Sequence, residues 1–183
     1  MLKRFLFSKT GVLISTTIFI LFTALVLPWF SQLSVTMTHT SFSPDTDLFY
    51  SAEAFSENMR LYGPAGRHFY ILSRWTFDVL WPVVYAGFLI SLTGYLASGL
   101  NRTRRRGVML VPILGVLFDL LENTLATVNV ALYPDQIPFL LKLLQGTSLL
   151  KWVFLSLSFL IILSLAGLHI YRRFKPTGNS DYS

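Results

Sequence analysis

Cysteine is absent from this chain of 183 residues, and charged residues are scarce. Without cysteine the sequence offers no disulfide, no thiolate nucleophile, no cysteine-ligated metal and no CxxC redox pair. Membrane oxidoreductases that work through paired cysteines are therefore excluded. Charged residues make up 13% of the chain, about half of the roughly 25% found in soluble domains. The mean hydropathy is +0.57, and the apolar residues fall in runs too long for soluble helices. The composition indicates an integral membrane protein.

Histidine is also scarce, with only His39, His68 and His169 in the chain. No two of them are spaced by four residues, and only His169 lies in a long apolar segment, close to its end. A haem held between facing helices requires histidines inside the bundle. We therefore expect neither a haem nor any other cofactor, and no metal site.

Four apolar segments are long enough to cross a bilayer, which takes about 20 mostly apolar residues in a helix. They span about residues 12–29, 77–97, 108–132 and 148–171. The sequence predicts an all-α fold, a four-helix transmembrane bundle in a single domain over residues 1–175, followed by a disordered cytoplasmic tail at 176–183. The first segment starts like a signal peptide but continues to Pro28-Trp29-Phe30 without a cleavage site, so we expect it to be retained.

Lysine and arginine indicate the orientation. The N-terminus carries three, the connection between the second and third segments four and the C-terminus three, which is ten of the fifteen in the chain. By the positive-inside rule these three regions face the cytoplasm. The sequence therefore predicts a multi-pass protein of a bacterial inner membrane with both termini cytoplasmic. The net charge of +6 is interpreted as this topology signal, and no nucleic-acid partner is expected.

The connection over residues 31–74 is long and is predicted to face outward. An amphipathic helix is expected over Asp47–Tyr62, with Asp45 or Thr46 as its N-cap and Gly63-Pro64 as its end. Its apolar stripe consists of Ala52, Phe55, Met59 and Tyr62. A second helical stretch is expected to start near Gly66 and to continue into the second span. The first helix either lies on the membrane surface or covers the end of the bundle, and covering the bundle is favoured.

Several ionisable residues fall inside or next to these spans, where each costs about 2.5 to 3.5 kcal/mol at the helix centre. On the second helix Arg74, Asp78 and Tyr85 follow Arg67 along one face, and Arg74 and Asp78 can pair at a spacing of four residues. On the third helix one face carries Asp119, Glu122 and Asn123, and the fourth helix contributes Lys151. Depths estimated from the helical rise place Lys151, Glu122, Asp78 and Arg74 at similar levels, so a polar cluster is predicted in the outer half of the membrane.

The preferred hypothesis is that this cluster lines a pocket for a small amphipathic ligand, a lipid or an isoprenoid. The candidate ligand-binding residues are Arg74, Asp78, Trp81, Tyr85, Asp119, Glu122, Asn123 and Lys151. The polar head is expected at Glu122, Asp119 and Lys151, whereas Tyr85, Trp81 and phenylalanines line the apolar part. Expected partners are membrane lipids, a small hydrophobic ligand and, as a further option, a second copy of the chain.

Three alternatives remain open. The chain is a structural or assembly subunit whose buried charges only hold the helices together. It is a membrane isomerase in which a desolvated carboxylic acid transfers a proton. Or it is a proton-coupled transporter, which would require an oligomer because four spans without an inverted repeat are few for a carrier.

The chain resembles an uncharacterised family of small bacterial four-helix membrane proteins over about residues 48–155. The matching residues are Gly66, Arg67, Tyr70, Arg74, Asp78, Pro82, Tyr85, Asp119, Glu122, Asn123, Tyr133-Pro134 and Lys151. The resemblance implies four spans and an inner-membrane location, and it implies no activity. In architecture alone the layout is similar to that of sterol-isomerase and sigma-2-receptor domains, but no motif matches residue by residue, so no catalytic role follows.

Overall fold

The structure is a computed structural model that describes residues 5–174; the predicted tail at 176–183 lies outside this range. All regular elements within it are helices. They are α2 (Lys9–Leu21), a π-helical turn (Phe22–Val26), α3 (Leu27–Thr38), α4 (Ala52–Trp75), α5 (Phe77–Leu96), a 3-10 turn (Ala97–Gly99), α6 (Arg102–Ala131) and α7 (Pro138–Phe174). Four stretches are long and apolar enough to cross a membrane: Lys9–Thr38, Ala52–Gly99, Arg102–Ala131 and Pro138–Tyr171. The predicted all-α bundle with four candidate spans is confirmed.

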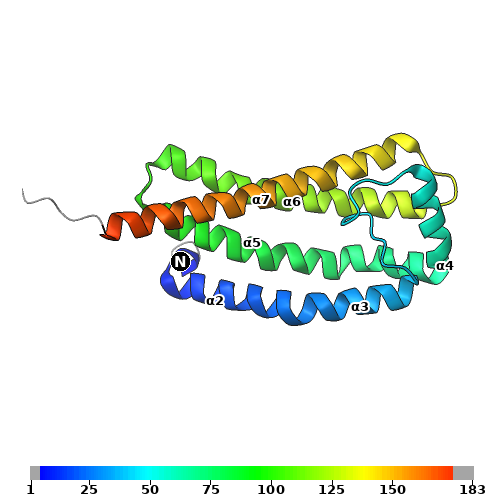
Figure 1. Ribbon diagram of the computed structural model, residues 1–183, viewed down its shortest axis with the longest axis horizontal. Coiled ribbons are helices and arrows are strands. Elements are labelled where there is room, and N and C mark those ends of the chain that lie inside the picture. The colour runs from blue at the N-terminus through cyan, green and yellow to red at the C-terminus, as the bar shows by residue number, and fades with distance from the viewer. Residues whose placement is uncertain (1–4, 175–183) are drawn as a thin grey trace, which may run out of the picture.

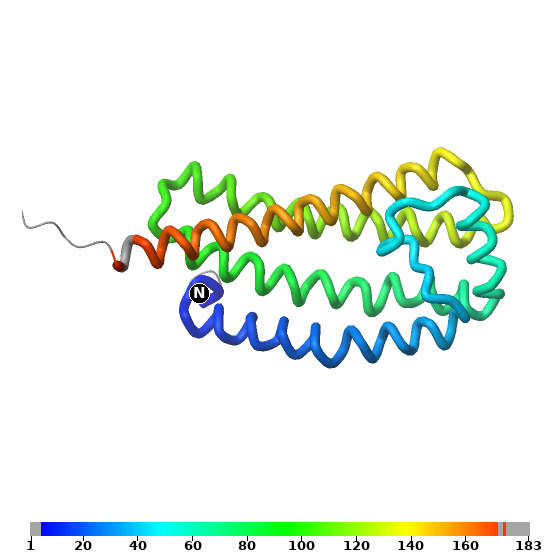
Figure 2. Tube along the Cα trace, viewed as in Figure 1, coloured from blue at the N-terminus to red at the C-terminus, as the bar shows by residue number. Residues whose placement is uncertain are grey.

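The long helices run side by side along the long axis of the molecule (Figure 1). The most extensive packing joins α6 to α7, and α5 packs against α2 and α6; α4 packs against α3 and α6. The start of α2, the α5–α6 connection and the end of α7 gather at one end of the bundle, which we call the basic end because of the arginines in 102–106 (Figure 2). The opposite end, the cap end, holds the loop at 39–51, the first half of α4 and the α6–α7 turn.

The first and fourth helices extend further toward the cap end than hydropathy predicts. The first continues from the predicted end at Trp29 to Thr38, and the fourth begins at Pro138 rather than Ser148. Polar side chains lower the hydropathy of these extensions. Two of them, Thr36 and Thr147, donate hydrogen bonds to carbonyls of the preceding helical turn and are therefore paired within the helix. The extension of the first helix forms part of the wall of the site described below.

The amphipathic helix of the long connection covers the cap end of the bundle. Its apolar stripe is almost fully buried and packs with the ends of α6 and α7, in a cluster formed by Phe55, Met59, Tyr62, Tyr70, Ala126, Val130, Leu141 and Leu144. The helix begins at Ala52, with the Ser51 side chain accepting a hydrogen bond from the Ala54 N–H. The predicted N-cap at Asp45 or Thr46 was therefore wrong, because a serine next to the first turn takes this role.

The chain turns at Gly63, as the sequence predicts. Its φ of 61° and ψ of 177° fall in a region that is essentially restricted to glycine. Next to this turn, Arg67 Nη1 donates a hydrogen bond to the Met59 carbonyl at 2.7 Å. The Arg67 guanidinium also lies over the Tyr133 ring, 4.5 Å from its centroid. Arg67 thus contacts residues of the cap end and is not part of the charged cluster that contains Arg74.

Candidate functional site

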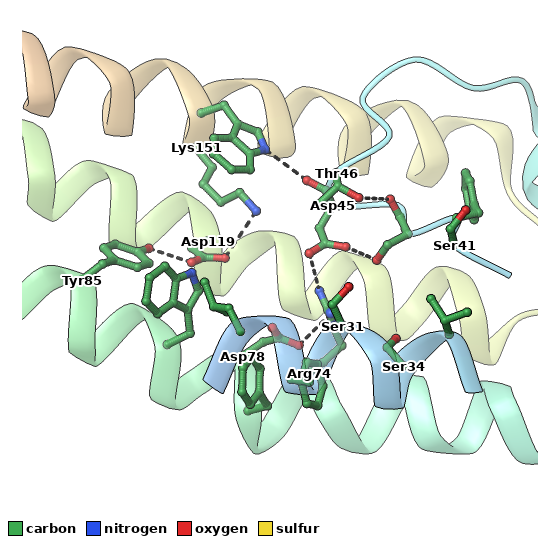
Figure 3. A pocket seen from close by; sticks show the side chains of 18 of the residues that line it. Ser31, Ser34, Ser41, Asp45, Thr46, Arg74, Asp78, Tyr85, Asp119 and Lys151 are labelled. Carbon is green, nitrogen blue, oxygen red and sulfur yellow. Dashed lines mark hydrogen bonds and ion pairs between the residues drawn. The ribbon is translucent and has the colours of Figure 1, made fainter. Parts of the chain in front are cut away.

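Two groups of buried charges face each other below the cap end (Figure 3). The first is centred on Arg74, at the end of α4. Its Nη2 lies 2.7 Å from Asp78 Oδ2, and its Nη1 lies 3.2 Å from Asp45 Oδ2. Asp78 is on the first turn of α5, whereas Asp45 belongs to the loop at 39–51. We call these three residues the Arg74 group; its guanidinium connects the loop to the bundle.

The second group is centred on Lys151 of α7. Its Nζ lies 2.6 Å from Glu122 Oε2 and 3.7 Å from Asp119 Oδ1, both on α6. Tyr85 of α5 donates a hydrogen bond from its hydroxyl to Asp119 Oδ2 at 2.7 Å. These four residues, the Lys151 group, join three helices and are all buried. The spacing of Asp119 and Glu122 on one helical face brings both carboxylates to the same cation.

Asn123 compensates for the proline in α5. Pro82 has no N–H, so the Asp78 carbonyl one turn earlier loses its helical donor. Asn123 Nδ2 donates to this carbonyl at 2.8 Å. In a membrane interior the group would otherwise remain unpaired, since no water is available there. Asn123 of α6 thus supplies the hydrogen-bond donor that the backbone of α5 lacks at Pro82.

This contact predicts a thermodynamic coupling between Asn123 and Pro82. Asn123→Leu should lower the free energy of unfolding by about 1 to 3 kcal/mol, because it leaves a buried carbonyl without a donor. In a Pro82→Ala background the new N–H of residue 82 supplies that donor, so the same substitution should cost less. A double-mutant cycle on thermal or denaturant unfolding in detergent checks this. Equal costs in both backgrounds would contradict the assignment.

A cavity of about 350 Å³ lies between the two groups. Its charged lining residues are Asp45, Arg74, Asp78, Asp119 and Lys151. The apolar and aromatic lining residues are Leu27, Phe30, Val35, Phe42, Phe77, Trp81, Tyr85, Trp152 and Leu155, and we call the aromatic ones the aromatic wall. Hydroxyl groups of Ser31, Ser34 and loop residues complete the lining. The side chains in Figure 3 come from α3, the loop, α4, α5, α6 and α7.

Six of the eight candidate residues predicted from the sequence line this cavity: Arg74, Asp78, Trp81, Tyr85, Asp119 and Lys151. Glu122 and Asn123 do not line it. Glu122 is 0% exposed and lies on the far side of the Lys151 ammonium, where its Oε1 has no hydrogen-bond partner in the part of the chain described. Asn123 is occupied by the Asp78 carbonyl. Their ligand-binding role was inferred from the helical face. The face gives the depth and direction of a side chain, but not which other groups lie between it and the cavity.

Asp45 is the main residue of the site that sequence reasoning missed. It was interpreted as a helix cap, since a loop without periodicity gives no direction for its side chains. In the structure it accepts hydrogen bonds from Ser43 Oγ and pairs with Arg74, while Trp152 Nε1 donates to its backbone carbonyl at 3.1 Å. Burial alone would raise the pKa of Asp45, but the charges of Arg74 and Lys151 and its hydrogen bonds hold this pKa well below the ordinary value. The carboxylate is therefore ionised at neutral pH.

Comparison of the chain with models of known families, with curated proteins and with solved structures gives no significant match. Within residues 5–174 no group of three or more metal-ligating side chains comes together. The fold and the site thus define a class: a small multi-pass helical membrane protein with a charged cavity near one end of the bundle.

Proposed function

We propose that this chain binds a small amphipathic molecule, a lipid or an isoprenoid, in the cavity between the Arg74 and Lys151 groups. The observation that carries the proposal is the combination of charged with apolar and aromatic side chains in the lining of one cavity. A polar head would lie against the charges, and a hydrocarbon part along Phe30, Trp81 and Leu155. Pockets that combine apolar and aromatic side chains with polar groups that fix the orientation are typical of small-molecule sites.

The arrangement of the helices favours access from the bilayer. Residues of α3 and of α7 both line the cavity, yet among the described residues these two helices make at most marginal contact with each other. Apolar side chains such as Trp29, Val153 and Leu160 are exposed on the same helices, as expected for surfaces in contact with lipid. A ligand dissolved in the membrane would therefore enter between α3 and α7.

A purely structural role accounts for only part of the site. To hold α6 to α7, the close contact of Lys151 with Glu122 is sufficient. It does not require a cavity next to the charges, a bordering aromatic wall or a loop carboxylate paired with Arg74. We assign the structural role to Glu122 and the ligand-facing role to the residues that line the cavity.

A substitution that fills the cavity tests the proposal. Ser34→Trp should place an indole in the cavity and abolish retention of a co-purified amphipathic molecule, measured by native mass spectrometry and by extraction from protein gently solubilised from its membrane. Thr36→Trp is the matched control, because Thr36 lies on the same helix, is exposed and does not line the cavity. Equal retention in both variants, or none in the unmodified protein, would contradict the proposal.

We further propose that the basic end faces the cytoplasm of a bacterial inner membrane, so that the cavity lies in the outer half of the bilayer. The support is the positive-inside rule applied to the arginines of the α5–α6 connection. Single cysteines can be placed in the cysteine-free chain at Thr46 and Ser98, both exposed and at opposite ends. In intact cells an impermeant maleimide should label T46C and not S98C, and the reverse pattern would overturn the orientation.

A further inference from the structure

The two buried groups contain more acidic than basic side chains. In the Arg74 group one guanidinium stands between the carboxylates of Asp45 and Asp78. In the Lys151 group one ammonium stands between those of Asp119 and Glu122. Each group therefore has two acids for one base, and together they carry four acids for two bases. All six residues are intermediate or buried in exposure, and the cavity lies between the two groups.

In a membrane interior a surplus carboxyl group either stays ionised at a cost or holds a proton, and a cationic ligand would favour its ionised form. A ligand that adds negative charge would increase the cost, whereas a ligand that adds positive charge would lower it. The aromatic wall acts in the same direction. Trp81, Tyr85, Phe77 and Trp152 line the cavity, and the negative faces of aromatic rings attract organic cations.

An inorganic cation fits the cavity less well than an organic one. Among the described residues no three acidic or histidine side chains converge as metal ligands. The cavity of about 350 Å³ is also far larger than one water-sized site, whose share of liquid volume is about 30 Å³. An ammonium group would compensate the surplus carboxyl groups, and a hydrocarbon body attached to it would fill the volume.

We infer that the ligand of this cavity is a cationic amphiphile, with an amine head between the Arg74 and Lys151 groups and a hydrocarbon part against the aromatic wall. The inference rests on the proposed function and specifies its substrate class. The head approaches Asp78 and Asp119, the carboxylates that line the cavity from α5 and α6. Arg74 and Lys151 remain in place as the counter-charges that keep the acids together when the cavity is empty.

The test compares three amphiphiles with the same brominated C18 chain and different heads: dibromostearylamine, dibromostearyl alcohol and dibromostearate. Bromine quenches tryptophan, and Trp81 and Trp152 line the cavity whereas Trp29 and Trp75 do not. The full chain carrying W29F and W75F is titrated in neutral maltoside micelles. We expect saturable quenching with an apparent Kd at least about tenfold lower for the amine than for the alcohol, and the weakest binding for the carboxylate.

Substitutions of the cavity carboxylates test where the amine binds. D78N and D119N should each reduce the preference for the amine over the alcohol by at least about threefold, because each removes one of the carboxylates that the amine approaches. E57Q is the matched control, since Glu57 is exposed and lies outside the cavity. If D78N or D119N fails to fold, the comparison of the three heads on the W29F/W75F protein still decides.

The outcomes separate the inference from the proposed function. Binding of the alcohol or the carboxylate as tight as that of the amine would overturn the inference and leave an amphiphile site in place. An amine preference unchanged in D78N and D119N would also overturn it, because the amine would then bind elsewhere. The absence of saturable quenching by all three probes would overturn both.

Discussion

Lys151→Met should be the most damaging single substitution in the bundle. Methionine keeps the length of the side chain but removes the ammonium that Glu122 and Asp119 share at 2.6 and 3.7 Å. Removing one partner of a buried ion pair typically costs about 3 to 5 kcal/mol, because the remaining charge stays buried and unpaired. We expect a loss of that order, measured as thermal unfolding by fluorescence-detected size exclusion, with little monodisperse protein recovered.

The partner substitution distinguishes this cause from loss of packing. Glu122→Gln combined with Lys151→Met removes both charges of the tightest contact and should recover a large part of the lost stability. Lys142→Met is the matched control, since Lys142 is exposed on the same helix, and it should change stability by less than about 0.5 kcal/mol. If Lys151→Met were as stable as Lys142→Met, the Lys151 group would not be the buried unit described here.

Arg74→Met should have the second largest effect and should act on the loop as well as on the bundle. The substitution leaves Asp45 and Asp78 without the guanidinium that joins them, at a cost again of about 3 to 5 kcal/mol. Asp45 should then leave the cavity, since an unpaired carboxylate is better solvated in water. Hydrogen exchange over residues 39–51 should become at least about tenfold faster, as measured by mass spectrometry.

Arg60→Met controls for the loss of an arginine from the same helix. Arg60 pairs with Glu57 on the exposed face of α4, and such surface pairs contribute only about 0 to 1 kcal/mol.

Because the folded pKa of Asp45 is depressed, its stabilising contribution is present above the ordinary carboxylate pKa and is lost only as the pH falls below it. The protection factors of the loop amides, which correct for the pH dependence of intrinsic exchange, should therefore be unchanged between neutral and mildly acidic pH. Unchanged exchange in Arg74→Met would contradict the role of Arg74 as the link.

Much of the fold follows from local features that the sequence displays directly. Long apolar runs identify four helices because a bilayer sets their length. The stripe of Phe55, Met59 and Tyr62 identifies the buried face of α4 because helical periodicity is local. The charged face of α6 and the Arg74–Asp78 spacing predict one polar cluster for the same reason. The structure forms the predicted pairs, but in two groups with a cavity between them.

The remaining features depend on contacts between distant segments. The docking of Asp45 against Arg74 and the bond from Trp152 to its carbonyl join a loop to two helices, and neither partner carries a local signal for the other. The contact of Asn123 with the Asp78 carbonyl is similar, although the missing donor of Pro82 could have suggested that a neighbouring helix supplies one. Whether Glu122 or Asp119 faces the cavity depends on where the Lys151 side chain lies, which the helical face alone does not determine.

The most direct test of the account is a crystal structure of the unmodified chain, grown in a lipidic mesophase from protein that was never stripped of its lipids. We predict elongated density between α3 and α7, with its polar end within hydrogen-bond distance of a carboxylate of the Arg74 or Lys151 group and its apolar part along Trp81 and Phe30. A cavity closed by direct contact between the two groups, or one that holds only water, would contradict the account.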